Sequence, residues 1–228
     1  MVIGSGLIAN ALKEYENDDT VIVFASGVSN SMGNDESAFE REKNLLLSFK
    51  DHKGKLIYFS TCSIYDASLS NSSYVKHKLE MEKLIQENFK KYFILRLPTL
   101  VGNTVNSHTF FNNFKDKLKN NEEIIIHKNA SRYLMDVESL PAIIKLMLNT
   151  HDKNAIVNIA FDNKASVSDI VSYMRTKLRS NSNMTIVDKG ADLLIDNSDF
   201  LNMLSNYPQF DVLCVKTMQD VLNKYLSE

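Results

Sequence analysis

Short apolar runs alternate with helical patterns along almost the whole chain, and this alternation is the feature that most limits its fold. The runs at residues 2–3, 21–25, 56–59, 92–97, 123–127 and 155–160 predict strands. Helical patterns cover residues 7–15, 37–49, 74–88, 110–118, 140–148, 167–178 and 217–226. Strands that alternate with helices in this way build a parallel sheet with helices on its faces. We therefore expect an α/β protein.

The first predicted strand runs directly into a glycine loop, Gly4-Ser5-Gly6-Leu7-Ile8-Ala9, which opens a helical pattern. A G-x-G-x-x-A loop in this context is typical of dinucleotide sites. Gly4 would permit the tight turn, Gly6 would let a diphosphate approach the backbone, and Ala9 would allow close helix packing. The phosphates would then lie against the backbone of Gly4, Ser5, Gly6, Leu7 and Ile8. A glycine turn without a ligand is the alternative.

A hydroxyl-rich segment and a Tyr/Lys pair follow the third predicted strand. The segment is Ser60-Thr61-Cys62-Ser63-Ile64-Tyr65, and Tyr74-Val75-Lys76-His77-Lys78 comes shortly after it. Residues four apart share a helix face, so we expect the Lys78 ammonium near the Tyr74 phenol. A nearby cation favours phenolate and lowers a phenol pKa from about 10. This arrangement suits a tyrosine that works as a general acid and base; a surface helix with a chance Tyr/Lys spacing is the alternative.

Together these segments resemble the short-chain dehydrogenase/reductase superfamily, and in particular its extended branch (NAD-dependent epimerase/dehydratase), which acts on nucleotide-linked sugars. Glu82 completes the Tyr-x-x-x-Lys-x-x-x-Glu pattern of that branch, and the resemblance covers roughly residues 1–180. It implies that Thr61 hydrogen-bonds the reacting substrate oxygen, that Tyr74 is the acid/base, and that Lys78 holds the nicotinamide ribose of NAD or NADP.

The resemblance also implies the architecture. We expect a single domain over residues 1–228 with a Rossmann-type, doubly wound parallel sheet. A small C-terminal substrate lobe would be built from about residues 103–140 and 161–228.

The segment 21–27 departs from the family pattern, because it ends in Ala25-Ser26-Gly27 without the acidic residue that usually holds the adenosine ribose. Residues 21–26 resemble the fourth strand of the extended branch, and residues 42–46 resemble the helix after it. On this interpretation the sheet is shortened by two strands, and most of the adenosine pocket is absent. Ala25, Ser26 and Gly27 would then flank the cofactor. The alternative is an ordinary second strand.

Two further segments resemble parts of the family's site. Residues 95–102 resemble the segment that lines the nicotinamide and substrate side, which places Leu97 at the cofactor. Arg132 opens a block whose arginine often reaches the substrate diphosphate; a structural salt bridge is the alternative. Sugar-nucleotide dehydratases carry an Asp-Glu pair directly after the catalytic threonine. Here Cys62 and Ser63 replace that pair at the substrate site, which disfavours dehydratase chemistry.

The composition limits the partners. A net charge of -2 gives no basic surplus for binding nucleic acid. No apolar run approaches the roughly 18 residues of a membrane span, and no secretion signal opens the chain. The two cysteines, Cys62 and Cys214, make neither a disulfide framework nor a zinc pattern, and we expect no metal. A reducing cytoplasm is therefore the expected location.

We conclude from the sequence that this is an NAD(P)-dependent oxidoreductase of a nucleotide-diphosphate sugar, most simply a ketoreductase, of the kind used in polysaccharide biosynthesis. A nucleotide-sugar epimerase is the alternative within the family. A non-catalytic partner subunit with a degenerate cofactor site is the alternative of another class.

The resemblance further implies a homodimer that pairs through the helices predicted at 37–49 and 74–88. Apolar residues spread around these two helices, namely Leu45, Leu46, Leu47, Leu79, Met81, Leu84 and Ile85.

Overall fold

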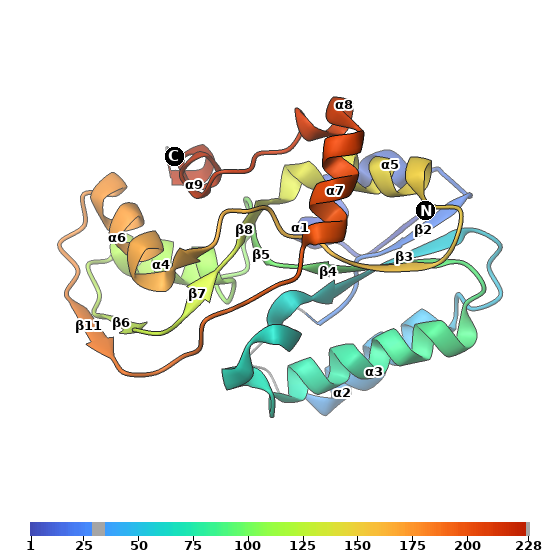
Figure 1. The fold of residues 1–228 in the computed structure, drawn as a ribbon. Coiled ribbons are helices and arrows are strands. Elements are labelled where there is room, and N and C mark those ends of the chain that lie inside the picture. Colours follow the sequence, from blue (N-terminus) through green and yellow to red (C-terminus); the bar gives the residue numbers. More distant parts are fainter. Residues whose placement is uncertain (29–34, 227–228) are drawn as a thin grey trace.

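The computed structural model describes residues 1–28 and 35–226, which form a sheet-centred body and a smaller second body beside it (Figure 1). Within those residues the central sheet has five parallel strands in the order β1-β2-β3-β4-β9. The strands are β1 (Val2–Ile3), β2 (Val21–Phe24), β3 (Lys55–Thr61), β4 (Tyr92–Leu97) and β9 (Ala155–Asn158). The expected Rossmann-type α/β fold is confirmed.

The position of β2 decides between the two interpretations of residues 21–26. Among the described residues β1 is one of the two edge strands of this sheet, and β2 lies between β1 and β3. Its Val23 pairs with Val2 on one side and with Ile57 on the other. In the full Rossmann order 3-2-1-4-5-6, the second strand lies on the far side of the first, and the fourth strand takes the place that β2 has here. β2 therefore corresponds to a fourth strand, and the sheet is shortened.

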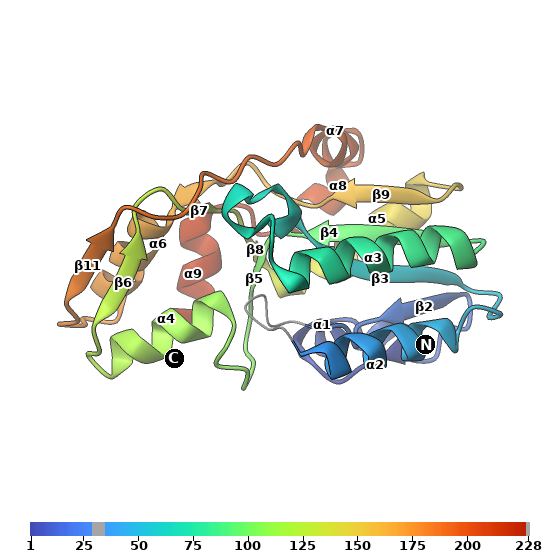
Figure 2. The same cartoon turned by 90° about the horizontal axis from the view of Figure 1, so that it is seen from below.

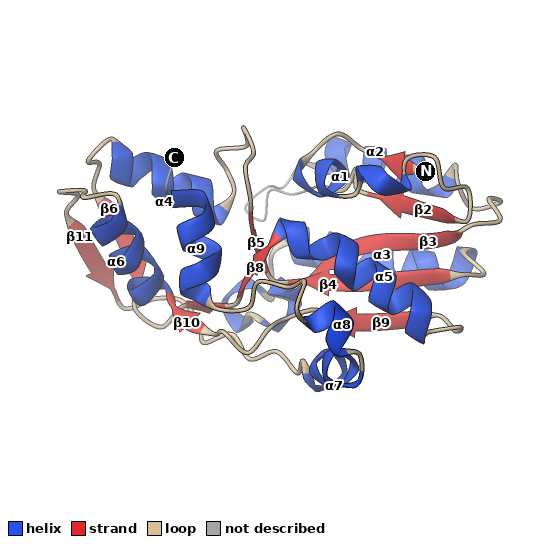
Figure 3. Ribbon diagram, turned by 90° about the horizontal axis from the view of Figure 1, so that it is seen from above, coloured by secondary structure: helices blue, strands red, loops and turns tan. Residues whose placement is uncertain are grey.

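Helices cover both faces of the sheet (Figures 1 and 3). One face carries α2 (Glu36–Leu47) and α3 (Ser73–Asn88), and the other carries α1 (Leu7–Ala11), α5 (Leu140–Thr150), α7 (Ser198–Asn206) and α8 (Pro208–Asp211). Successive strand residues point to opposite faces. Ile22 and Phe24 accordingly pack with α2 and α3, while Val21 and Val23 pack with α5. Burial on both faces explains why this strand is apolar throughout.

The two crossovers at this end of the sheet have opposite hands. The strands advance in one direction from β1 to β2 to β3, yet α1 and α2 lie on opposite faces. One of the two crossovers must therefore be left-handed, although right-handed crossovers are the rule in some 98% of cases. Loss of two strands from beyond β1 accounts for this, because α1 would otherwise lead to the far side of β1.

The second body has its own core beside the sheet (Figures 2 and 3). It contains α4 (Phe110–Lys119), α6 (Val167–Lys177), α9 (Met218–Leu226), and the strand pairs β6 (Ile124–His127) with β11 (Met184–Val187) and β7 (Ser131–Arg132) with β10 (Ala165–Ser166). β5 (Thr99–Val101) and β8 (Leu134–Asp136) pair at its junction with the sheet. α7 and α8 fall within the range expected for the substrate lobe, but they pack on the sheet through Phe200 and Phe210.

Most predicted elements differ from the observed ones only at their ends. α1 ends at Ala11 and a 3₁₀ helix, Lys13–Tyr15, follows it; further 3₁₀ helices are Cys62–Tyr65, Ala67–Leu69 and Val137–Ser139. The strands β5, β7, β8, β10 and β11, of two to four residues each, are not among the predicted ones. The sequence also predicts a loop of small residues over 26–31, and part of that loop lies outside the described residues. No helix in the described part of the chain is long and apolar enough to cross a membrane.

Candidate active site

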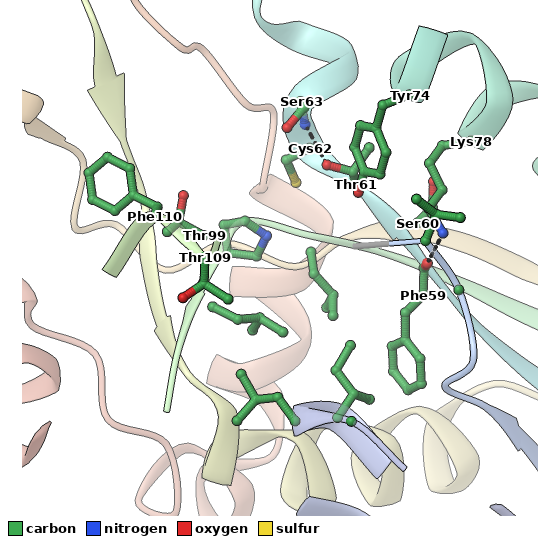
Figure 4. Close-up of a pocket in the computed structure, with 18 of the residues that line it drawn as sticks. Phe59, Ser60, Thr61, Cys62, Ser63, Tyr74, Lys78, Thr99, Thr109 and Phe110 are labelled. Carbon is green, nitrogen blue, oxygen red and sulfur yellow. Dashed lines mark hydrogen bonds between the residues drawn. The ribbon is translucent and has the colours of Figure 1, made fainter. Parts of the chain in front are cut away.

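A cavity of about 330 Å³ opens at the carboxyl ends of β1 to β4 and extends to the second body (Figure 4). In doubly wound sheets, ligands bind outside these strand ends. The cavity brings together most of the site residues that the sequence predicts: Gly6, Leu7, Ile8, Ala25, Gly27, Thr61, Cys62, Ser63, Tyr74, Lys78, Leu97 and Arg132. Gly4, Ser5 and Ser26 are not among its lining residues.

The two glycines of the first loop have different surroundings. Gly4 has a φ of +130°, and a Cβ there would lie 2.4 Å from the Ala25 carbonyl oxygen. Only glycine fits this turn, which packs the loop against the end of β2. A Cβ on Gly6 would meet no atom within 4 Å, so the space beside Gly6 is open. Gly4 thus shapes the loop, and Gly6 keeps its backbone accessible from the cavity.

Thr61 ends β3 and caps the 3₁₀ helix that follows it. Its Oγ1 accepts a hydrogen bond of 3.0 Å from the Ser63 backbone N–H (Figure 4). A hydroxyl has one proton and two lone pairs. This contact occupies a lone pair, and no described residue accepts the Thr61 proton. Thr61 can therefore donate to an oxygen atom in the cavity.

Tyr74 and Lys78 lie one turn apart at the start of α3, and both side chains are buried at the cavity wall. The Lys78 Nζ lies 6.0 Å from the centre of the Tyr74 ring. It donates to the Glu42 carboxylate at 3.0 Å, to the Tyr58 hydroxyl at 3.0 Å and, more weakly, to the Phe59 carbonyl at 3.5 Å. The cation beside Tyr74 is therefore paired with a carboxylate.

Glu42 is a residue of this site that the sequence did not single out. It lies on α2, is fully buried, and accepts from the Val28 N–H at 2.6 Å and the Tyr58 hydroxyl at 2.7 Å besides Lys78. Its Oε2 also lies 3.0 Å from the His77 Nε2. Burial acts to raise the pKa of Glu42, but the His77 hydrogen bond, the Lys78 charge and the other donors outweigh it and lower the pKa to about 2.

The position of Glu42 on its helix could have indicated a buried carboxylate. It lies four residues before the buried Leu46, on the stripe of α2 that faces the sheet. A carboxylate on such a stripe needs a buried partner. Gly27 makes room for that partner: a Cβ at this position would lie 2.7 Å from the Lys78 Nζ and 2.9 Å from the Glu42 Oε1.

Cys62 is a buried thiol beneath the cavity. Its side chain is 1% exposed, and its Sγ donates to the Arg96 carbonyl at 3.2 Å. Burial raises the pKa of Cys62 to about 12. A thiol in this state is a poor proton donor and a poor nucleophile at neutral pH.

Arg132 lies across the cavity from the sheet and makes a salt bridge with the buried Asp66 carboxylate at 3.3 Å. Its Nη1 also donates to the Ser131 carbonyl at 2.7 Å. Both contacts use Nη1, and no acceptor for Nη2 or Nε lies among residues 1–28 and 35–226. Arg132 is thus a salt-bridge partner that still has donors available at the cavity.

The second body contributes residues that sequence reasoning missed. Thr104, Asn106, His108, Thr109 and Phe110 line the cavity from the segment that leads into α4. Polar loop residues of this kind give no pattern in a single sequence, because only the fold brings them opposite β3.

The chain matches the model of one protein family, and its fold is similar to those of several solved structures. The model of the NAD dependent epimerase/dehydratase family matches residues 4–160. No curated protein matches the sequence. The fold is similar to that of UDP-glucuronic acid 4-epimerase from Bacillus cereus, solved with UDP-glucuronic acid and NAD (TM-score 0.71, 20% identity, 98% of this chain and 78% of that chain).

Two other solved structures are similar to a comparable degree. One is a dTDP-4-dehydrorhamnose reductase from Clostridium acetobutylicum (TM-score 0.72, 14% identity, 96% of this chain and 84% of that chain). The other is UDP-N-acetylglucosamine 4-epimerase from Methanobrevibacter ruminantium (TM-score 0.68, 16% identity, 99% of this chain and 82% of that chain). At these identities the likeness concerns the fold.

Proposed function

Because the chain belongs to the NAD dependent epimerase/dehydratase family, we propose that it is an NAD(P)-dependent oxidoreductase of a nucleoside-diphosphate sugar. One observation carries this proposal: a single cavity is lined by Thr61, Tyr74 and Lys78 together with the open glycine loop at Gly6. These are the groups that hydride transfer at a sugar carbon requires, namely a hydrogen-bond donor, an acid/base and a phosphate loop.

The residues present fit one half of a dinucleotide. The open backbone at Gly6, Leu7 and Ile8 would hold the diphosphate, and Ala25, Gly27 and Leu97 would flank the nicotinamide. When bound, the nicotinamide supplies or accepts the hydride. The adenosine half has fewer partners, since β1 is an edge strand of the described sheet and the residues directly after β2, Ala25-Ser26-Gly27, include no carboxylate. We therefore expect weak binding and ready exchange of the cofactor.

The proton chemistry falls to Tyr74 and Thr61. In the reductive direction Tyr74 would donate its phenolic proton to the substrate oxygen, and the Thr61 hydroxyl would polarise that oxygen. Lys78 would hold the nicotinamide ribose. The weakest of its three contacts, with the Phe59 carbonyl at 3.5 Å, is the one that a ribose hydroxyl would replace. On the opposite wall, the Nη2 and Nε of Arg132 would bind the substrate diphosphate.

Within the family we favour a ketoreductase. A reductase exchanges its cofactor in every turnover, whereas an epimerase must retain it, and the open adenosine side suits exchange. An epimerase is the second candidate, because 4-epimerases are among the similar folds. Elimination is disfavoured, since the dehydratase Asp-Glu pair is replaced by Cys62 and Ser63, and Cys62 has its pKa raised to about 12 by burial.

Cofactor titration and turnover test the proposal. NADH or NADPH fluorescence should reveal binding, and absorbance at 340 nm should fall with a 4-keto sugar nucleotide. An epimerase would instead interconvert two sugar nucleotides without net loss of NADH. Absence of binding by either cofactor would refute both candidates and favour a non-catalytic partner subunit.

A variant pair locates the chemistry. Tyr74→Phe should lower turnover by roughly 10²–10⁴-fold, because general acid/base catalysis contributes about that much. Cofactor binding and fold should stay intact, and Tyr207→Phe, at an exposed position on the sheet side, should behave as wild type. Wild-type turnover in Tyr74→Phe would show that the mechanism is wrong.

A further inference from the structure

The direction of the Thr61 hydroxyl depends on the turn in which it sits. Thr61 is the last residue of β3, and the 3₁₀ helix Cys62–Tyr65 begins directly after it. The only described hydrogen bond of its hydroxyl is the one from the Ser63 N–H, a local contact within the turn. Whatever fixes the residues on both sides of Thr61 therefore fixes where its hydroxyl points.

An ion pair between the buried Glu82 and the partly buried Arg96 lies directly behind this turn. Glu82, on α3 one turn after Lys78, is 3% exposed, and Arg96 comes from β4. The Arg96 Nη2 lies 2.6 Å from the Glu82 Oε2, and the Arg96 Nε lies 2.9 Å from Oε1. Two parallel contacts of this kind fix the relative orientation of the two groups.

The pair contacts the chain before Thr61 as well as after it. Before it, the Ser60 hydroxyl donates to the Glu82 Oε1 at 2.5 Å. After it, the Cys62 thiol donates to the Arg96 carbonyl at 3.2 Å, and the Arg96 Nη1 donates to the Tyr65 hydroxyl at 2.9 Å. The Tyr65 hydroxyl in turn donates to the Asn158 side chain of β9 at 3.0 Å.

These contacts exceed what is needed to tie α3 to β4. Replacing a buried ion pair with well-packed apolar residues often costs little stability. The role of such a pair is therefore better inferred from the groups it contacts than from its charges. Here the other hydrogen bonds described for the two side chains go to Ser60 and Tyr65, which lie on either side of Thr61.

We propose that Glu82 and Arg96 are positioning residues that hold the Thr61 hydroxyl in the cavity by clamping the turn on both sides. The catalytic part of this inference rests on the proposed function. The structural part, that the pair keeps the turn closed, does not.

Cys62 provides a direct probe of the turn without any substrate. Its thiol is buried under the turn, whereas Cys214 is buried in the connection between α8 and α9. Alkylation with iodoacetamide at pH 8, read at each cysteine by mass spectrometry, measures opening at both places in one sample. Cys214 serves as the internal control for global unfolding.

Two variants of the pair and one control should be compared. Glu82→Gln removes the charge, and Arg96→Lys keeps a cation but loses the planar fork that reaches both Glu82 and Tyr65. A charged hydrogen bond is worth about 1.5–3 kcal/mol, and each 1.36 kcal/mol is about ten-fold, so we expect alkylation of Cys62 to accelerate roughly 10- to 150-fold. The Cys214 rate should stay unchanged. Glu80→Gln, an exposed change on the same helix, should alter neither rate.

Turnover completes the test. Both variants should lower kcat by roughly ten-fold or more while the cofactor affinity stays unchanged, since the pair contacts the turn and not the glycine loop. Equal acceleration at both cysteines, or none at Cys62, would overturn the clamp. Faster labelling of Cys62 with unchanged kcat would overturn the positioning role. If the wild-type protein turns over no sugar nucleotide, the proposed function fails while the alkylation result still decides the clamp.

Discussion

Replacing Glu42 with glutamine should destabilise the protein at neutral pH and make its stability less sensitive to acid. The carboxylate is fully buried and joins α2 to Lys78 on α3 and Tyr58 on β3. Glutamine has nearly the same shape but no charge, so the buried Lys78 would lose its counterion. Removing one partner of a buried ion pair costs about 3–5 kcal/mol.

The pH dependence follows from the lowered pKa. The pKa of Glu42 falls from its ordinary value of 4.5 to about 2 in the folded protein. A group with a lowered folded pKa stabilises the protein fully above its unfolded pKa, and this stabilisation is lost as the pH falls through the folded pKa. The difference of roughly 2.5 units corresponds to about 3 kcal/mol, at about 1.36 kcal/mol per unit.

Urea unfolding at pH 7, 4.5 and 3 would measure this, with circular dichroism as the signal. The difference in unfolding free energy between wild type and Glu42→Gln should be largest at pH 7 and should shrink by about 3 kcal/mol toward pH 2. Glu40→Gln is the matched control, because Glu40 lies on the same helix but is 65% exposed and 3.9 Å from Lys43. It should stay within about 0.5 kcal/mol of wild type at every pH. An equal gap at pH 7 and pH 3, or no gap at pH 7, would refute the assigned role of Glu42.

Three further outcomes are expected. Gly4→Ala should destabilise the fold by at least about 1–2 kcal/mol, since its φ is +130° and the new Cβ would meet backbone atoms. Gly6→Ala should leave thermal stability unchanged and weaken NADH binding, because a Cβ there meets no atom within 4 Å. Calorimetry and fluorescence titration would show this contrast, and equal melting temperatures of the two variants would contradict it. Arg132→Ala should weaken binding of the sugar nucleotide by about 1.5–3 kcal/mol and cofactor binding less, and equal weakening of both would indicate a purely structural role for its salt bridge with Asp66. The protein should be a homodimer through α2 and α3, where Leu79 is 43% exposed; a light-scattering mass near the 25.9 kDa of the chain at micromolar concentration would exclude this.

The sequence alone determined the features that are local or periodic. The alternation of apolar runs and helical patterns fixed the α/β class, because sheet and helix periods are properties of neighbouring residues. The spacing of Tyr74 and Lys78 placed both on one helix face for the same reason. The tight turn at Gly4 was also readable, because a G-x-G-x-x-A pattern directly follows a strand and opens a helix. Even the fourth-strand character of residues 21–26 was visible in the residues at its end.

Tertiary structure alone decided which charges meet. Glu42 and Lys78 are 36 residues apart in the chain, and Glu82 and Arg96 come from a helix and a strand, so no local period could pair them. The expectation of an ammonium beside Tyr74 did not include Glu42, because a carboxylate on a helix does not show in the sequence which cation it pairs with. The residues from 104 to 110 that line the cavity were hidden for the same reason. Contacts between elements depend on how the layers pack, and that packing is set by the burial of the whole core and not by any one segment.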